Sequence, residues 1–341
     1  MDGTVEECLT SLQRGLLSGG PRPRYLASVA AGKNTEVNKR LSVSEVKSDM
    51  VYCILREQLG NQLFIWAAGY SLARDWGCPL YLITSNYGRT GTYMYLRVFP
   101  VGAKFLSPWP GLICRRLLRR ELYSLQSFTH VVGNWNESSE GAFENSHFAK
   151  LRSAPVKPTL LDDLFQSWHY FGHHRESIRR ELSVTTSTMT RHADAETLKR
   201  IRDTESVSVH IRRTDYLADH NTKFAVCGPQ YFSRCLDLLR DVLKRPVFYV
   251  FSDDISWARS EFSAPDINFV SSVQFRSSNI NDFVLMANCR SHVISNSTFS
   301  WWAAYAGDSS GHTLMPSRWF NDGSAPIEHK MVDGWTPVSV D

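Results

Sequence analysis

The stretch of sequence that decides the fold is SVSVHIRRTDYL, residues 206–217. Its first six residues, 206–211, alternate polar side chains with valine or isoleucine, which is typical of a β-strand. Arg212 and Arg213 follow directly, and Asp215 comes two residues later. Two guanidinium groups at the end of a buried strand are costly unless an anion lies in front of them. The stretch therefore predicts a buried strand that ends at an anion-binding site.

Strands and helices alternate in the sequence that follows. The sequence predicts strands at 206–211, 246–252, 267–270, 292–295 and 312–317, separated by helices at 228–244, 255–262, 280–290 and 299–307. This order is typical of a parallel sheet that is covered by helices on both faces.

A second α/β pattern opens the fold. It consists of a strand at 50–55, a loop at 56–61, a helix at 62–76 and a strand at 79–84. The chain from there to residue 200 shows no clean alternation. Residues 1–49 have few aromatic side chains and no sustained periodicity, which predicts a mobile tail. We therefore predict two Rossmann-like halves, an N-terminal half at 50–200 and a C-terminal half at 201–335.

Polar side chains follow three strands of the C-terminal half. They are Arg212, Arg213 and Asp215 after the first strand, Asp253 and Asp254 after the second, and Asn296, Ser297, Thr298 and Ser300 after the fourth. In an open parallel sheet, ligands bind beyond the carboxyl ends of the strands. We expect all of these side chains to line one crevice.

Each group also has a simpler interpretation. Backbone N–H groups at the helix start after Ser297 can bind an anion, but Ser297 or Thr298 can equally serve only as the helix cap. The arginines can form surface ion pairs with Asp215. His210 can be a core histidine whose hydrogen bonds are satisfied.

The two aspartates at the end of the second strand fit two kinds of ligand. Asp253 or Asp254 can accept hydrogen bonds from ribose hydroxyls or from guanine, and the pair can also hold a divalent metal. Arginines are able to neutralise a diphosphate, so no metal is required for that task.

Composition excludes several other classes of protein. The net charge of +4 and the pI of about 8.6 are too mild to argue for nucleic-acid binding. No apolar run reaches the roughly 18 residues needed to span a membrane. The seven cysteines include no C-x-x-C pair and no histidine at metal spacing, which argues against a structural zinc site.

Four segments resemble the motifs of one enzyme family, in the same order and at similar spacing. They are LGNQLFIWAAGYSLAR at 59–74, HIRRTDY at 210–216, FYVFSDD at 248–254 and DFVLMANCRSHVISNSTFSWWAAY at 282–305. The family is that of the α-1,2-fucosyltransferases, glycosyltransferase family 11. The HIRRTDY segment also resembles α-1,6- and protein O-fucosyltransferases.

The resemblance implies a GT-B-like α/β fold with two Rossmann-like, doubly wound halves and the donor site in the C-terminal half. It implies inverting, metal-independent transfer of L-fucose from GDP-β-L-fucose to the 2-hydroxyl of a terminal galactoside on a glycan. GDP-fucose is then a donor substrate, and no cofactor is expected. Animal members are Golgi proteins with an N-terminal membrane anchor and bacterial members are cytoplasmic. The animal members therefore imply a Golgi membrane location for this chain. Because the chain shows no anchor, the cytoplasm is the alternative.

Roles are carried over residue by residue. The resemblance implies that Arg212 holds the β-phosphate, that His210 and one of Asp253 and Asp254 contact the nucleoside, and that Ser297, Thr298 and Phe299 border the diphosphate. Asn61, in the LGNQ segment, joins this donor-binding set. Inversion also requires a base for the acceptor hydroxyl. The candidates are Asp215, which alternatively only orients Arg212, and Glu57.

Two departures from the family pattern leave alternatives open. Glu57 and Gln58 stand where the family usually has a glycine pair, and Thr214 stands where α-1,2 members more often have glycine. The first departure places longer side chains in a loop that should approach the fucose, where they would affect acceptor choice or activity. The alternatives are a fucosyltransferase of another linkage and an inactive relative that binds GDP-fucose or glycans.

Overall fold

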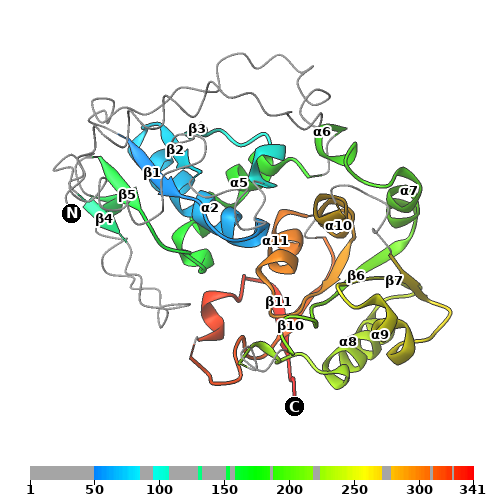
Figure 1. The fold of residues 1–341 in the computed structure, drawn as a ribbon. Helices are drawn as coiled ribbons and strands as arrows, with labels where there is room; N and C mark the ends of the chain where they lie inside the picture. The colour runs from blue at the N-terminus through cyan, green and yellow to red at the C-terminus, as the bar shows by residue number, and fades with distance from the viewer. Residues whose placement is uncertain are drawn as a thin grey trace, which may run out of the picture. The chain divides into compact units, whose positions relative to one another are not determined.

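The computed structural model describes residues 50–84, 95–106, 130–132, 151–153, 158–184, 187–217, 223–270, 278–307, 310–324 and 326–341 (Figure 1). The predicted tail at 1–49 and much of the middle of the chain lie outside these residues. Within them, two parallel sheets carry the fold.

The first sheet has the strand order β3-β2-β1-β5-β4. Its strands are β1 (Val51–Ile54), β2 (Leu80–Ile83), β3 (Lys104–Leu106), β4 (His130–Val132) and β5 (Thr159–Leu161). The helix α2 (Leu59–Trp76) connects β1 to β2, and Gly77 ends it in a left-handed conformation with φ of 63°. The predicted β-α-β unit is confirmed.

The second sheet has the strand order β11-β10-β9-β6-β7-β8. Its strands are β6 (Glu205–Ile211), β7 (Pro246–Ser252), β8 (Ile267–Phe269), β9 (Ser291–Val293), β10 (Thr313–Pro316) and β11 (Trp335–Val338). The helices between them are α8 (Pro229–Val242), α9 (Ile255–Glu261), α10 (Ser278–Ala287) and α11 (Thr298–Ala306). Every described strand pair is parallel, as the alternating pattern predicted.

Both faces of the second sheet are buried. Val207, Val209 and Ile211 of β6 pack in one hydrophobic cluster with the apolar side chains of α8 and α9. The residues between them face the opposite side, where Ser208 Oγ lies 2.8 Å from His292 Nδ1 on the neighbouring strand β9. Tyr249 and Phe251 of β7 belong to the hydrophobic cluster on that side, together with α10 and α11. The sheet is thus doubly wound.

Five short helices lie between β5 and β6 in the described part of the sequence. They are η4 (Trp168–Tyr170), η5 (Gly172–His174), α5 (Arg175–Leu182), α6 (Ser187–Thr190) and α7 (Ala195–Asp203). Two further short helices are η2 (Tyr95–Val98) and η7 (Ile327–His329). The sequence pattern did not predict these elements, nor the strands β3, β4, β5 and β11.

An aromatic cluster joins the helices of the two sheets, and α2 and α11 lie next to each other in Figure 1. The aromatic cluster consists of Phe64, Phe171, Trp301, Trp302 and Tyr305. The Phe64 ring on α2 lies 4.7 Å from Trp301 and 5.2 Å from Trp302 on α11. One continuous hydrophobic core therefore contains side chains from both sheets.

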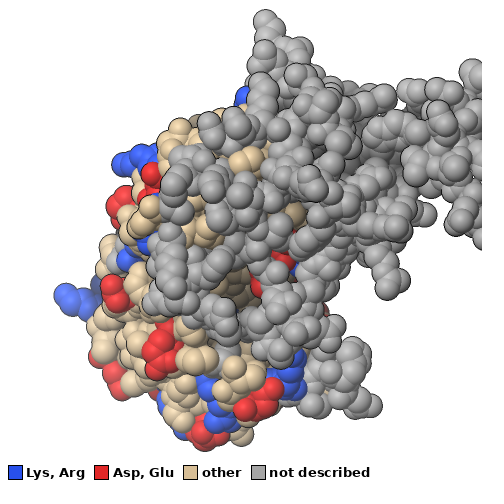
Figure 2. All heavy atoms as spheres, turned by 90° about the vertical axis from the view of Figure 1, so that its left-hand side faces the viewer, with Lys and Arg blue, Asp and Glu red and all other residues tan. Residues whose placement is uncertain are grey.

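The surface shown in Figure 2 carries acidic and basic side chains of the described residues interspersed with each other. Among the described residues, no helix has both the length and the apolar character needed to cross a lipid bilayer. The described cysteines are free thiols, and three of them, Cys53, Cys235 and Cys289, are buried.

Candidate active site

A cavity of about 830 Å³ lies where the two sheets face each other. The second sheet contributes the residues that follow β6 and β7 and the start of α11, and the first sheet contributes the start of α2. Seven of the predicted site residues from the second sheet line it, and these are His210, Arg212, Asp215, Asp253, Ser297, Thr298 and Phe299. From the loop before α2 and its first turn come Glu57, Gln58, Leu59, Gly60 and Asn61.

Arg212 is the basic side chain among the described residues that line this cavity. Its Nη2 donates to Asp215 Oδ2 at 2.7 Å, and its Nε lies 3.5 Å from Asp253 Oδ2. Burial alone would lower the pKa of Arg212, but the hydrogen bond to Asp215 and the charges of both aspartates raise it above its usual value. The guanidinium side chain remains 37% exposed, so it is held in position and accessible to a ligand.

Asp253 fixes the turn that carries Arg212. Its carboxylate accepts hydrogen bonds from the backbone N–H of Arg213 at 2.9 Å and of Thr214 at 3.2 Å, and from Thr214 Oγ1 at 2.7 Å. Thr214, which departs from the family spelling, is therefore part of this turn. The sequence pattern did not indicate that Asp253 has this positioning contact.

Asp254 and Arg213 are not among the described residues that line the cavity. Asp254 Oδ1 accepts from Trp257 N at 3.1 Å and so caps α9, while the Arg213 guanidinium lies over the Trp257 ring at 4.0 Å. Of the two adjacent arginines, Arg212 faces the cavity and Arg213 packs away from it, because their side chains leave the chain in opposite directions at the end of β6. The expectation that all polar residues at the strand ends line one crevice is wrong for Arg213, Asp254 and Ser300.

His210 is a buried residue at the cavity wall. Its Nδ1 lies 3.0 Å from Ser295 Oγ, and its ring lies 5.6 Å from that of Phe299. Burial lowers the pKa of His210 to about 3, and the charge of Arg212 acts in the same direction. The imidazole is therefore neutral at pH 7 and can act as a hydrogen-bond partner but not as a cation.

The start of α11 is built as a ligand-facing helix end. Asn296 Nδ2 donates to the backbone oxygens of Phe224 at 3.0 Å and Trp319 at 2.9 Å, which fixes the chain before the helix. Judged on the described residues, the Ser297 side chain makes no capping hydrogen bond to α11. Ser300 is fully buried and donates to the Ser297 carbonyl at 3.2 Å. The first turn of α11, whose N–H groups have no acceptor within the helix, thus lies at the cavity that Ser297, Thr298 and Phe299 line.

The start of α2 meets the start of α11 at this cavity. A Cβ atom on Gly60 would lie 2.4 Å from Thr298 Oγ1 and 2.7 Å from Phe299 N, so only glycine permits the approach. The sequence predicted that α2 begins at residue 62, but it begins at Leu59 and Gly60 lies in its first turn. Two helix N-termini, each with a partial positive charge, therefore converge on the cavity that contains Arg212.

The loop before α2 holds Glu57 in an unusual backbone conformation. Glu57 has φ of 58°, a left-handed value that favours glycine. Its carbonyl accepts from Gln62 Nε2 at 2.8 Å, and the preceding Arg56 pairs with Asp162 after β5. The loop is held from both sides, and the Glu57 side chain lines the cavity.

Asn61 is positioned by residues that the sequence did not indicate. Its Oδ1 accepts from Gln166 Nε2 at 3.0 Å. Lys330 donates to the Gln166 backbone oxygen, and its Nζ lies 5.1 Å from the centre of the Phe64 ring. Lys330 is fully buried, so its ammonium group depends on these contacts for stabilisation. Gln166 and Lys330 come from segments without a recognisable pattern, and no sequence signal would have found them.

Comparisons with known proteins agree with this geometry. Residues 50–338 match the family model described as Glycosyl transferase family 11. The chain belongs to this family. The match includes both sheets and every described residue that lines the cavity.

Relatives of this family 11 chain occur in bacteria and mammals. The chain is 29% identical to an alpha-1,2-colitosyltransferase of Escherichia coli over 281 residues, which cover 77% of this chain and 89% of the relative. It is 26% identical to galactoside alpha-(1,2)-fucosyltransferase 2 of Oryctolagus cuniculus over 260 residues, 73% of this chain and 64% of the relative. Among solved structures, the fucosyltransferase NodZ from Bradyrhizobium superposes with a TM-score of 0.51 at 15% identity, covering 78% of this chain and 96% of NodZ. This likeness shows the fold, which is GT-B-like.

Proposed function

We propose that this family 11 chain transfers L-fucose from GDP-β-L-fucose to the 2-hydroxyl of a terminal galactoside on a glycan, with inversion and without a metal. One observation carries the proposal: Arg212 and the N-termini of α2 and α11 meet at one cavity. This arrangement suits a ligand with a concentrated negative charge, as a sugar nucleotide has in its diphosphate. The names of the relatives, which include galactoside alpha-(1,2)-fucosyltransferases, support the linkage and the acceptor.

The proposed reaction is a single displacement. The acceptor hydroxyl oxygen attacks C1 of fucose, the bond from C1 to the phosphate oxygen breaks, and GDP leaves with the electron pair. Negative charge develops on the leaving diphosphate, where the Arg212 guanidinium and the two helix N-termini stabilise it. The proton of the attacking hydroxyl passes to a carboxylate.

Two carboxylates among the predicted catalytic residues line the cavity, and they differ in their surroundings. Asp215 is bound to Arg212 at 2.7 Å, which supports the interpretation that it orients the arginine. Glu57 lines the same cavity from the loop before α2. The remaining donor contacts are proposed for His210 and Asp253 at the nucleoside and for Asn61 beside α2.

A second candidate differs in the donor sugar. The Escherichia coli relative is named for colitose transfer, and the alignment covers 89% of its length. A sugar nucleotide that carries colitose is therefore the first alternative donor. A Golgi location stays a prediction from the animal members, and a bacterial relative keeps the cytoplasm as the alternative.

The test is release of GDP from GDP-fucose, with and without lactose, in the wild type and in Arg212→Ala. We expect lactose-dependent release in the wild type and its loss in the variant. A chelator should not change the rate, and inhibition that manganese reverses would instead make Asp253 part of a metal site. Binding of GDP-fucose without release would point to the inactive relative or to another acceptor. Release only from the colitose donor would support the second candidate, and absence of binding would refute the phosphate site.

A further inference from the structure

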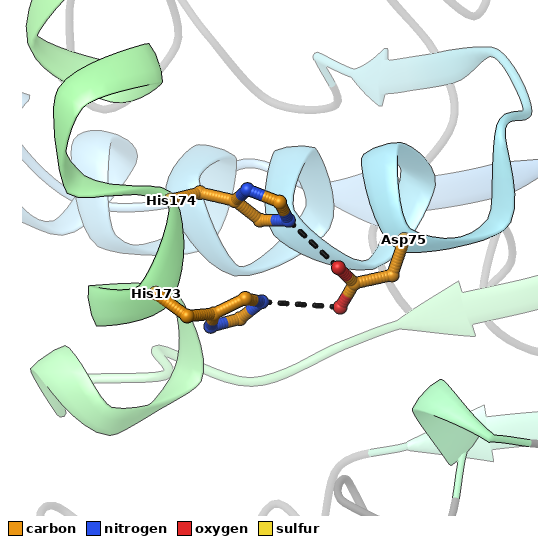
Figure 3. Close-up of side chains that lie close together, drawn as sticks. All are labelled: Asp75, His173 and His174. Atoms are coloured by element: carbon orange, nitrogen blue, oxygen red, sulfur yellow. Dashed lines mark hydrogen bonds and ion pairs between the residues drawn. The ribbon is translucent and has the colours of Figure 1, made fainter.

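Three potential metal ligands lie together at the end of α2 that is remote from the cavity. Asp75 is in the last turn of α2, and His173 and His174 form the end of η5. His174 Nε2 lies 2.7 Å from Asp75 Oδ1, and His173 Nε2 lies 3.1 Å from Asp75 Oδ2. Figure 3 shows both imidazole rings directed at the one carboxylate. Along α2, this cluster is about 24 Å from the cavity, at 1.5 Å per residue.

The donor set and its spacing fit a zinc-class cation. Three ligand atoms, one from each residue, lie within 4.8 Å of one another. Tetrahedral zinc with bonds of about 2.0–2.1 Å places its ligand atoms roughly 3.3 Å apart. The His174 Nε2–Asp75 Oδ1 pair would have to open from 2.7 Å by about 0.6 Å, and ligand atoms that are up to 4.8 Å apart would have to close in around the ion. Two imidazole nitrogens and one carboxylate oxygen are the ligands of many zinc sites, with water completing the coordination.

The Asp75 carboxylate and the helix end favour a cation at this place, whereas the positive charge of Arg152 opposes it. Asp75 puts a carboxylate at the C-terminal end of α2, where the helix dipole is negative, and a positive ion there relieves the repulsion. Arg152 Nε donates to Asp75 Oδ2 at 2.8 Å and so acts as an outer partner that leaves Oδ1 for the ion. The buried Ser71 Oγ lies 3.1 Å from His173 Nε2, the nitrogen that would bind the ion, so this contact has to be released when the ion enters.

The site is open to solvent but not fully exposed. The side chains of Asp75, His174 and His173 are 18%, 19% and 30% exposed, so an ion and its water can enter without local unfolding. The histidines lie 98 and 99 residues from Asp75 along the chain, which is why no spacing motif revealed them. The two ring centres are 4.2 Å apart and the ring planes are inclined by 45°, so the imidazoles lie next to each other beside the carboxylate.

We propose that Asp75, His173 and His174 bind one zinc-class divalent cation, which fastens the end of α2 to η5. Because η5 leads directly into α5 and α5 packs on α11, the ion connects the helix of the first sheet to a helix of the second. Its role is to stabilise the fold, and it takes no part in the proposed sugar transfer.

The test uses the full chain, freed of metal by a chelator and dialysed, with ZnCl₂ as the probe. Saturating Zn²⁺ should raise Tm by about 5 °C, and equilibrium dialysis should show one additional zinc per chain compared with the variants. The double variant His173→Gln/His174→Gln and the single variant Asp75→Asn should lose both effects. His312→Gln, which changes an exposed histidine outside the cluster, should keep them. Mg²⁺ should give no shift, because it prefers oxygen ligands.

Three outcomes would overturn the site. An equal Tm shift in the wild type and in both cluster variants would place the zinc elsewhere, for example on thiols. Absence of any shift in the wild type would mean that the cluster holds only imidazole–carboxylate hydrogen bonds. A shift with Mg²⁺ as large as with Zn²⁺ would exclude nitrogen ligation. If the double variant does not fold, the Tm shift of Asp75→Asn with Zn²⁺ tests the site in the same way.

Discussion

At the scale of single residues, Arg212 and Arg213 allow a matched comparison. Both are arginines at the end of β6, but only Arg212 lines the cavity, while Arg213 lies over the Trp257 ring. Arg212→Lys keeps the charge and loses the planar fork that binds a phosphate through two hydrogen bonds. We expect kcat/KM for GDP-fucose to fall about 100-fold, which is roughly 2.7 kcal/mol.

The control is Arg213→Lys, which should stay within a few-fold of the wild type in the same assay. Near-normal turnover in Arg212→Lys would remove the phosphate role from Arg212. An equal loss in both variants would indicate damage to the turn that Asp253 holds, not loss of a ligand contact.

Glu57 gives a second test, because its backbone and its carboxylate can be changed separately. A left-handed φ costs a non-glycine residue roughly 1 kcal/mol, so Glu57→Gly should raise the free energy of unfolding by about that amount. Glu57→Gln keeps the left-handed residue and removes only the charge.

The resemblance implies that the family usually has glycine at position 57, and we infer that the chemistry common to the family does not need this carboxylate. We therefore expect kcat to stay within about tenfold in both variants, with KM for lactose changed. A loss of kcat beyond 100-fold in both, with the fold intact, would make Glu57 the base and leave Asp215 as the residue that orients Arg212.

His210 links the site to pH. Its folded pKa of about 3 lies below the usual 6.5, so the unfolded chain binds a proton that the folded chain does not. Stability from this residue is therefore full above pH 6.5 and is lost as the pH falls toward 3. Between pH 5.5 and 4.5, the wild type should lose about 1.3 kcal/mol more than His210→Asn does. Urea unfolding at the two pH values measures this difference, and equal losses would show that the imidazole takes up a proton in the folded state.

At the scale of elements, the contact between the starts of α2 and α11 depends on Gly60. A methyl group there meets Thr298 and the Phe299 backbone. Gly60→Ala should therefore cost about 1–3 kcal/mol of stability, as expected for overpacking, and should weaken GDP-fucose binding by separating the two helix ends. The measurements are urea unfolding and donor titration.

Gly228→Ala is the matched control, because Gly228 lies at the N-cap of α8 and its added Cβ would meet only the flexible end of Gln230, at 3.2 Å. It should leave donor affinity unchanged. If Gly60→Ala binds GDP-fucose as tightly as the wild type, the convergence of the two helix ends is not part of the donor site.

The elements also show what the sequence could and could not predict. The strands of the second sheet were found because each has a clear apolar pattern bounded by helices, and Arg212, Asp253 and Ser297 followed from their ends. By contrast, β3, β4 and β5 have three residues each, too few for a period to appear. β11 contains Pro337, which is tolerated because the strand lies at the sheet edge.

The start of α2 was missed because Gly60 and Asn61 are typical of a loop. They lie in a helix because α11 approaches α2 closely at this point. A contact between segments that are distant in the sequence leaves no local sequence pattern. The same holds for Lys330 and Gln166, which reach the site from segments that are distant in sequence. Local periodicity thus predicted the scaffold and the strand ends, whereas contacts between distant segments required the structure.

At the scale of the whole molecule, the two sheets share one hydrophobic core. It contains Val51 and Leu82 from the first sheet together with Phe251 and Met315 from the second. We therefore expect residues 50–341 to unfold in one cooperative transition, although the proposed halves 50–200 and 201–335 resemble separate domains. Calorimetric and van't Hoff enthalpies should agree, and two resolved transitions would show that each half is stable alone.

The aromatic cluster between α2 and α11 has an optical consequence. Trp301 and Trp302 are fully buried there, with ring centres 4.7 Å and 5.2 Å from that of Phe64. Indole emission moves to longer wavelength when water reaches the ring. The chain has ten tryptophans, so the part of the emission that a Trp301→Phe/Trp302→Phe variant lacks reports on the place where the two sheets meet. Separation of α2 from α11 can then be followed in real time, without any added label.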